Sequence, residues 1–324
     1  MTSMSQVACR RPDCFPNDTG CAAGNISLSD CSDFNQEQDA SGVSDREVHD
    51  ESFPWSGRQL GTTDIRFITA AQRHHVVGIA GPAGSGKTTL LSLLFLAIYR
   101  GHSVGKFRFA GSYSLLGWEN IAHHLQLTPG QGINFPPHTT RSGRSPGLLH
   151  LAVSENNSKI ARDVVLADSS GEWFSAWTDN PSDSAASGAA WVVENSDRML
   201  VIADTEALIG ENRGAVRREL DFLIRRLQDV CGKDGIAMVW TKNDVERPEA
   251  VTSAVEGMFR QCFGEAPIFE VGFPKSETAS GENTVDQLKS IFSWAFELRT
   301  RVIVDTDPST DNPDSFLSFR GKGK

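Results

Sequence analysis

Two hydrophobic patterns alternate along the middle of this chain. Short apolar runs with the length and composition of buried strands occur at residues 76–80, 198–203, 236–240 and 268–271. Stretches in which apolar positions recur with the spacing of a helix occur at residues 90–100, 217–230, 251–263 and 285–298. This alternation predicts an α/β fold in which a mainly parallel sheet carries helices on both faces.

The part of the chain between the first helix and the second parallel strand has a different pattern. Residues 148–153 and 164–167 are two apolar runs separated by a polar turn, which predicts a hairpin. Residues 104–109 are typical of a strand, and residues 112–126 are typical of a helix. Residues 127–146 are rich in Pro, Gly, Ser and Thr without periodicity, and a loop of this length is usually functional.

The composition changes at both ends of the chain. Residues 1–60 are rich in Ser, Asp, Asn and Gly and have too few large apolar residues to form a core, so we expect a largely disordered acidic arm. Residues 303–324 are polar and are expected to form a flexible tail. The folded domain is then expected at residues 61–302, with a short strand or packing segment at residues 65–68.

The arm contains four of the six cysteines, Cys9, Cys14, Cys21 and Cys31. Four thiolates can bind Zn²⁺ tetrahedrally. However, their spacings contain no C-x₂-C pair and match no standard zinc ribbon. Two interpretations remain open: a small zinc-binding knob, or unpaired thiols in a flexible arm.

The charge pattern limits the possible partners. The formal net charge is −10, and the ten acidic and four basic residues of residues 1–60 contribute −6 of it. No basic stripe is present, which disfavours nucleic acid as a partner. The chain starts without an apolar signal segment, and its longest apolar run, residues 90–99, is too short to span a bilayer. We therefore expect a cytoplasmic protein without a membrane span.

The first apolar run leads into the sequence GPAGSGKTT at residues 81–89, which precedes the first helix. Strand, glycine loop and helix in this order match the P-loop, whose backbone N–H groups surround a phosphate chain. Lys87 is expected to reach the terminal phosphates, and Thr88 is expected to give its hydroxyl to Mg²⁺. The expected phosphate-contacting residues are Gly81, Ala83, Gly84, Ser85, Gly86, Lys87, Thr88 and Thr89.

Two later strand ends carry polar motifs where ligands bind in α/β sheets. Asp168 and Gly171 form a D-x-x-G motif, in which Asp168 can hold Mg²⁺ and the Gly171 N–H can meet the terminal phosphate. Thr241, Lys242 and Asp244 form a T-K-x-D motif. The Asp244 carboxylate can accept both the N1 and N2 hydrogens of guanine, a pair that adenine lacks. The Lys242 stem can lie along the base.

Other residues near these strand ends are weaker candidates. Asp204 follows the strand at residues 198–203 and points toward the site, although a turn-forming role is the better explanation. A backbone N–H that approaches guanine O6 is expected from Gly272, Phe273 or Ser276, after the last strand.

P-loop, D-x-x-G and T-K-x-D in this order resemble the G domain of translation-factor and Ras-like GTPases, over roughly residues 61–300. Within that class, SYSLLGWE at residues 112–119, LLHL at residues 148–151 and DSSGEWF at residues 168–174 resemble the bacterial double-GTPase family. Members of that family are associated with multi-protein bacterial conflict systems. The resemblance implies a GTP-controlled switch that hydrolyses GTP with Mg²⁺ beside partner proteins.

The sequence departs from the class near the expected γ-phosphate. The switch threonine that contacts Mg²⁺ and the terminal phosphate in this class is expected at Thr139 or Thr140, and Thr140 is the catalytic candidate. Glu172 stands where Ras-like relatives have glutamine. Glu172 is either a general base or simply an acidic residue in the first turn of a helix. Arg141 and Arg144 are either an arginine finger or solvated side chains.

Three functions are compatible with these motifs. The first is a GTPase in which Lys87, Glu172 and Thr140 act on the phosphates. The second is an ATPase, for which the T-K-x-D motif would be a coincidence. The third is an adaptor with a GTPase-like domain that does not hydrolyse nucleotide.

Overall fold

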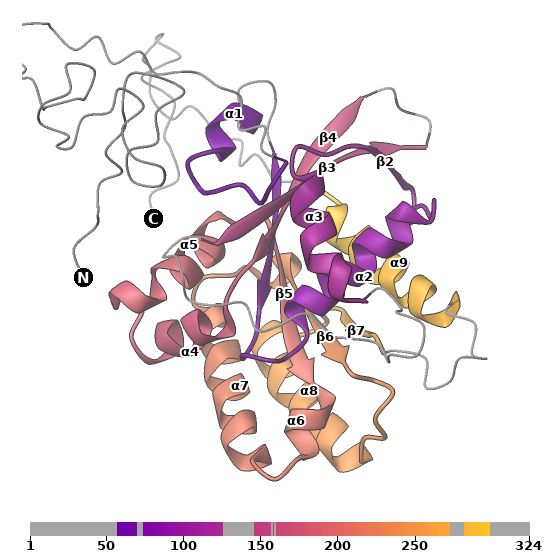
Figure 1. The fold of residues 1–324 in the computed structure, drawn as a ribbon. Helices are drawn as coiled ribbons and strands as arrows, with labels where there is room; N and C mark the ends of the chain where they lie inside the picture. The colour runs from indigo at the N-terminus through magenta and orange to yellow at the C-terminus, as the bar shows by residue number, and fades with distance from the viewer. Residues whose placement is uncertain are drawn as a thin grey trace, which may run out of the picture. The chain divides into compact units, whose positions relative to one another are not determined.

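A central β-sheet organises the part of the chain that the computed structural model describes, namely residues 57–69, 74–125, 146–156, 158, 160–272 and 282–298. Its seven strands lie in the order β2-β3-β4-β1-β5-β6-β7 (Figure 1). In chain order they are β1 (His75–Ala80), β2 (Phe107–Gly111), β3 (Gly147–Glu155), β4 (Ala161–Asp168), β5 (Arg198–Asp204), β6 (Ile236–Thr241) and β7 (Ile268–Glu270).

The sheet is mainly parallel, as the apolar runs predicted. Strands β4, β1, β5, β6 and β7 pair in parallel. The predicted hairpin is also confirmed, because β3 and β4 pair antiparallel from Gly147 opposite Asp168 to Ser154 opposite Ala161. Strand β2 adds an antiparallel edge to β3. It begins later than predicted, since Val104 makes only an isolated bridge to Phe107.

Helices follow most of the strands. They are α1 (Ile65–Thr69), α2 (Lys87–Tyr99), α3 (Leu115–Ala122), α4 (Gly171–Asp179), α5 (Ser187–Asn195), α6 (Thr205–Ile209), α7 (Arg213–Gln228), α8 (Glu249–Phe263) and α9 (Glu282–Phe296). Short 3₁₀ turns lie at His123–Leu125, Ser184–Ala186 and Lys233–Gly235. No helix in these described ranges has both the length and the apolarity needed to cross a membrane.

Three helices differ from the sequence-based expectation, and one of them is the short helix α6, where only a turn at Asp204 was expected. Ile65–Thr69 is a helix rather than a strand, because the Asp64 carboxylate accepts a hydrogen bond from the Gly61 N–H at 2.7 Å and closes a turn that starts the helix. Ile68 is buried in the core, so the alternative of a packing segment was right. Helix α5 was not predicted, since its Gly- and Ala-rich first turns carry little hydrophobic pattern. Gly188 lets α5 approach the ring of Trp173 closely.

The sheet separates two hydrophobic cores. One face packs against α1, α4, α5, α7 and α8, and the other packs against α2, α3 and α9. Figure 1 shows α2, α3 and α9 on the opposite side of the sheet from α4, α5 and α7. Along β1, Val76 and Ala80 enter the first core whereas Val77 and Ile79 enter the second. A strand buried on both faces in this way reads as a continuous apolar run.

His150 joins two segments that resemble the double-GTPase family. Its buried ring on β3 accepts a hydrogen bond at Nδ1 from the Tyr113 N–H at 3.0 Å, and its Nε2 lies 3.0 Å from an Asp163 oxygen. Its carbonyl accepts a hydrogen bond from the Trp118 indole at 2.9 Å. Burial lowers the pKa of His150, so the neutral ring donates from Nε2. These bonds fasten the start of α3 to the sheet.

We expect Trp118→Ala to destabilise the protein strongly. The side chain is fully buried, stacks on Phe95 at 5.9 Å and donates to His150. Truncation should lower the free energy of unfolding by about 3–5 kcal/mol, measured by urea denaturation. Phe222→Ala is the control, because Phe222 is 56% exposed on α7 and should change stability by at most about 0.5 kcal/mol. Equal effects of the two substitutions would contradict the described packing.

Candidate functional site

The glycine loop between β1 and α2 is the centre of the site. Gly84 and Gly86 have φ values of 73° and 90°, which ordinary side chains rarely adopt, and the chain curls back on itself there. Helix α2 begins directly after Gly86, and no side chain caps its N-terminus. Its first backbone N–H groups therefore need another acceptor, and a helix start of this kind favours an anion.

Lys87 is buried against this loop. Its Nζ donates to the carbonyl oxygens of Gly81 at 2.9 Å and Pro82 at 2.7 Å. Burial lowers the pKa of Lys87 to about 8, against the opposing attraction of Asp168 and Glu219. The carbonyl oxygens of the loop thus bind the Lys87 amine. With a pKa of about 8, a part of the Lys87 side chains is already uncharged slightly above neutral pH.

Asp168, at the end of β4, lies beside the start of α2. One of its oxygens accepts from the Thr88 hydroxyl at 2.9 Å, and the other accepts from the Gln59 side chain at 3.4 Å. Burial raises the pKa of Asp168, although hydrogen bonds from Thr88 and Gln59 and the charge of Lys87 oppose this. A buried carboxylate beside a hydroxyl is a set of hard oxygen donors, which fits Mg²⁺.

Magnesium typically takes only one or two protein carboxylates and completes its shell with water and substrate phosphates. The described part of the chain holds no group of three or more His, Cys, Asp or Glu side chains suited to a metal.

Gly171 begins α4 in direct contact with the glycine loop. A Cβ atom at this position would overlap the backbone of Pro82 and Ala83, so only glycine permits the approach. The next residue, Glu172, is exposed in the first turn of α4 and lines the cavity described below. Both interpretations of Glu172 therefore remain compatible with its position.

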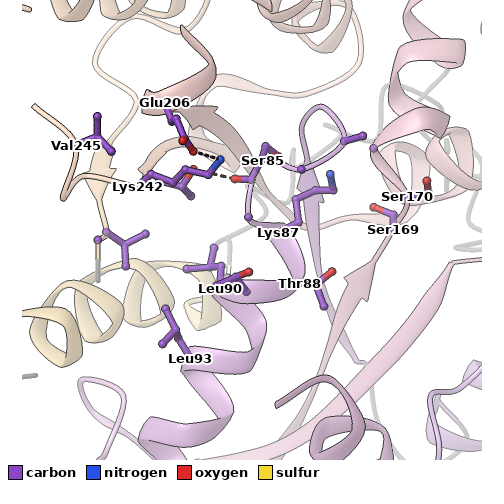
Figure 2. A pocket seen from close by; sticks show the side chains of 18 of the residues that line it. Ser85, Lys87, Thr88, Leu90, Leu93, Ser169, Ser170, Glu206, Lys242 and Val245 are labelled. Carbon is purple, nitrogen blue, oxygen red and sulfur yellow. Dashed lines mark hydrogen bonds and ion pairs between the residues drawn. The ribbon is translucent and has the colours of Figure 1, made fainter. Parts of the chain in front are cut away.

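The T-K-x-D motif lies on the other side of the loop. Thr241 ends β6, and its hydroxyl donates to the Ser85 carbonyl at 2.8 Å. Lys242 has a left-handed backbone with φ 53°. Its ammonium lies 2.8 Å from an Asp204 oxygen. It also lies 3.0 Å from a Glu206 oxygen (Figure 2).

Asp244 and Gly272 complete this side of the site. A Cβ at Gly272 would lie 2.7 Å from the Asp244 nitrogen, so the segment after β7 packs tightly on the T-K-x-D turn. The Asp244 side chain is partly exposed and lines the same cavity as the glycine loop. Among the described residues, no hydrogen bond or ion pair engages its carboxylate.

These segments enclose a cavity of about 740 Å³. Figure 2 shows Lys87 and Thr88 between Lys242 on one side and Ser169 and Ser170 on the other. The expected site residues that line it are Ala83, Gly84, Ser85, Gly86, Lys87, Thr88, Thr89, Gly171, Glu172, Thr241, Lys242 and Asp244. Two expected residues do not line the cavity but contact residues that do. The Gly81 carbonyl accepts a hydrogen bond from Lys87, and Asp168 accepts one from Thr88.

Some expected residues lie outside the described part of the chain. They are Thr139, Thr140, Arg141, Arg144, Phe273, Ser276 and the four arm cysteines Cys9, Cys14, Cys21 and Cys31. Conversely, sequence reasoning missed Gln59 and Glu206. Gln59 stands before the expected start of the domain, yet the neighbouring Leu60 bridges to Leu148 of β3. Glu206 meets the T-K-x-D motif only through its ion pair with Lys242 in the folded chain, and no sequence pattern signals this contact.

Structural comparison gives distant similarities. The chain resembles a structure of Methanosarcina barkeri Roco2 RocCORdC bound to GDP, with 10% identity and a TM-score of 0.35 over 68% of this chain and 48% of that chain. It also resembles a variant of SsGBP, with 13% identity and a TM-score of 0.33 over 72% of this chain and 60% of that chain. The chain thus spans about half the length of the first protein.

Sequence comparison is more specific. Curated proteins give no significant match. The family model described as Double-GTPase 2 matches residues 75–294, which is more than half of the chain. The matched segment contains the glycine loop, Asp168, Gly171 and the T-K-x-D motif, which are the elements that meet at the cavity. From this match, the chain belongs to the Double-GTPase 2 family.

Proposed function

We propose that this protein binds GTP and hydrolyses it to GDP and phosphate with Mg²⁺, as a switch that acts beside partner proteins. One observation carries the proposal. The glycine loop and the Asp244 carboxylate, which has no partner among the described residues, line a single cavity of about 740 Å³. The groups proposed to bind the phosphates and the base therefore line the same space. Pockets for small ligands and cofactors commonly have this size.

Guanine selection rests on Asp244. Its carboxylate can accept hydrogen bonds from N1 and N2 of guanine, and adenine offers no equivalent pair of donors. The bond from Thr241 to the Ser85 carbonyl holds the T-K-x-D turn at a fixed distance from the phosphate loop. A nucleotide whose base fits the T-K-x-D turn and whose phosphates fit the glycine loop is therefore favoured over one that fits only the loop.

Phosphate binding rests on the glycine loop and its neighbours. Lys87 supplies a positive charge, the start of α2 supplies backbone N–H groups, and Gly171 brings the N-terminus of α4 to the same place. Thr88 and Asp168 would hold Mg²⁺, which neutralises phosphate charge when bound. Gln59 donates to Asp168 and keeps the carboxylate oriented toward Thr88.

Hydrolysis requires a water molecule that attacks the γ-phosphorus while GDP leaves. Glu172 lines the cavity beside Gly171. In this proposal it orients the water and takes its proton. Thr139 or Thr140 stays the predicted switch residue. A slow intrinsic rate that partner proteins increase, within a bacterial conflict system, is what the family resemblance implies for this chain.

Replacing Asp244 with asparagine should weaken GTP binding by about 10- to 100-fold, because an amide cannot accept both guanine hydrogens. ATP binding should not change. The measurement is displacement of a fluorescent GTP analogue by unlabelled GTP and ATP. Asp221→Asn, in an exposed pair with Arg225 on α7, is the matched control and should bind GTP normally.

The unmodified protein decides between the alternatives in the same experiment. Equal displacement by GTP and ATP would refute guanine recognition and favour an ATPase. No binding of either nucleotide would favour a nucleotide-free adaptor.

The affinity for GTP should fall as the pH rises through the Lys87 pKa of about 8. The pKa of Lys87 is about 8 in the free protein, and only the protonated amine attracts phosphate, so each pH unit above 8 should cost up to about tenfold in affinity. Titrations at several pH values measure this slope. Guanosine lacks phosphates and should show no such loss, whereas a GTP affinity that is constant with pH would contradict the role of Lys87.

Glu172→Gln should slow GTP hydrolysis by about 100-fold while leaving GTP affinity unchanged, since the amide cannot accept the proton of the attacking water. Single-turnover phosphate release with Mg²⁺ measures the rate. Asp179→Asn, at the opposite end of α4, is the control and should hydrolyse normally. An unchanged rate in Glu172→Gln would leave Glu172 as an ordinary first-turn residue of the helix.

A further inference from the structure

The backbone of Lys242 is unusual. Within the described ranges it is the one residue other than glycine with a positive φ, at 53°. A left-handed conformation is unfavourable for a residue with a side chain, and such residues persist where the surroundings compensate. Because Lys242 belongs to the T-K-x-D motif, the groups that hold it also determine where this motif lies.

Two carboxylates hold the Lys242 ammonium. Asp204 lies 2.8 Å away at the end of β5, and Glu206 lies 3.0 Å away in the first turn of α6. Burial by itself would lower the pKa of Lys242, but the hydrogen bonds and charges of these two carboxylates outweigh it and raise the pKa. The ammonium therefore stays charged and paired.

The two carboxylates differ in their surroundings. The Asp204 side chain is only 6% exposed, whereas the Glu206 side chain is 67% exposed. Charge pairs in water contribute little, but a buried carboxylate without its partner is costly. The second oxygen of Asp204 accepts a hydrogen bond from the Ala207 N–H at 3.2 Å and caps α6. Asp204 thus links β5, α6 and Lys242.

This link lies at the wall of the nucleotide cavity. Lys242, Glu206 and Asp244 all line the cavity, and Figure 2 shows the Lys242–Glu206 pair on the side opposite Ser169 and Ser170. Fixing the Lys242 ammonium holds its aliphatic stem in place beside the space for a base. It also stabilises the strained turn from which Asp244 projects two residues later.

We infer that Asp204 is a positioning residue for guanine recognition, which acts through Lys242 and holds the T-K-x-D turn in its strained, binding-competent shape. This inference rests on the proposed binding of GTP. Asp204 does not touch the base in this arrangement. Its effect on binding passes through the ion pair with Lys242, and Glu206 adds a weaker, solvent-screened contact to the same ammonium.

Asp204→Asn tests the inference, because asparagine keeps an oxygen that can cap α6 and removes only the charge. Affinities for GTP and for inorganic tripolyphosphate are measured by titration, together with the melting temperature. GTP should bind about tenfold more weakly, corresponding to uncompensated strain of about 1.4 kcal/mol. Tripolyphosphate has no base that could use the T-K-x-D turn, so it should bind as before. Glu206→Gln should show a smaller loss for GTP.

The same substitution in a Lys242→Met variant tests whether Asp204 acts through Lys242. In Lys242→Met the ammonium is absent, so this variant should lose GTP affinity by itself, and adding Asp204→Asn should cause no further loss. Lys242→Met also provides the GTP and tripolyphosphate comparison if Asp204→Asn does not fold. Additive losses in the double variant would overturn the inference, as would an equal loss of GTP and tripolyphosphate binding.

GTP binding by the unmodified protein distinguishes a failure of the proposed function from a failure of the inference about Asp204. If it does not prefer GTP over ATP, the proposed function fails, and this inference fails with it. If it prefers GTP but Asp204→Asn binds GTP equally well, only the inference about Asp204 is overturned.

Discussion

The glycine loop is held by close contacts on two sides, and the rest of the site depends on this constraint. On one side, Gly171 approaches the backbone of Pro82 and Ala83 so closely that no side chain fits. On the other side, Thr241 donates a hydrogen bond to the Ser85 carbonyl. The ends of β4 and β6 are thereby fixed relative to the loop that follows β1. Groups from three strands that are distant in sequence meet at one cavity for this reason.

Charged side chains are buried at two places around this loop. The charge of Asp168 acts on Lys87 beside the glycine loop, and Asp204 forms an ion pair with Lys242 beside the T-K-x-D turn. Removing one member of a buried pair leaves an uncompensated charge, which costs more than the pair contributes. Burial lowers the pKa of Lys87 and raises that of Asp168, and the attraction between the two charges opposes both shifts only in part.

The two layers of helices give this arrangement its rigidity. Strand β1 is buried on both faces, and the Gly78 backbone leaves no room for a larger side chain against Met199 and Val192. On the opposite flank, the hydrogen bonds of His150 fasten the start of α3 to β3. The segments that resemble the double-GTPase family thus have a structural role here, since they join a helix to the antiparallel edge of the sheet.

The sequence by itself determined the class of fold and most of the residues around the cavity. Apolar runs marked the parallel strands because burial on both faces leaves no polar alternation, and the glycine loop and T-K-x-D are local patterns whose spacing carries their chemistry. The sequence pattern did not predict α5 or the helical form of α1. Helix α5 has small residues in its first turns, and α1 begins after a turn that the Asp64 side chain closes.

Only the tertiary structure decided which partners these motifs have. Asp204 and Lys242 are far apart in the sequence and meet because β5 and β6 are parallel neighbours whose ends coincide, with Asp204 opposite Thr241. The contact of Gly171 with the glycine loop and the bond from Gln59 to Asp168 are likewise set by strand order. Such contacts leave no local pattern, since they depend on how distant segments are brought together by packing.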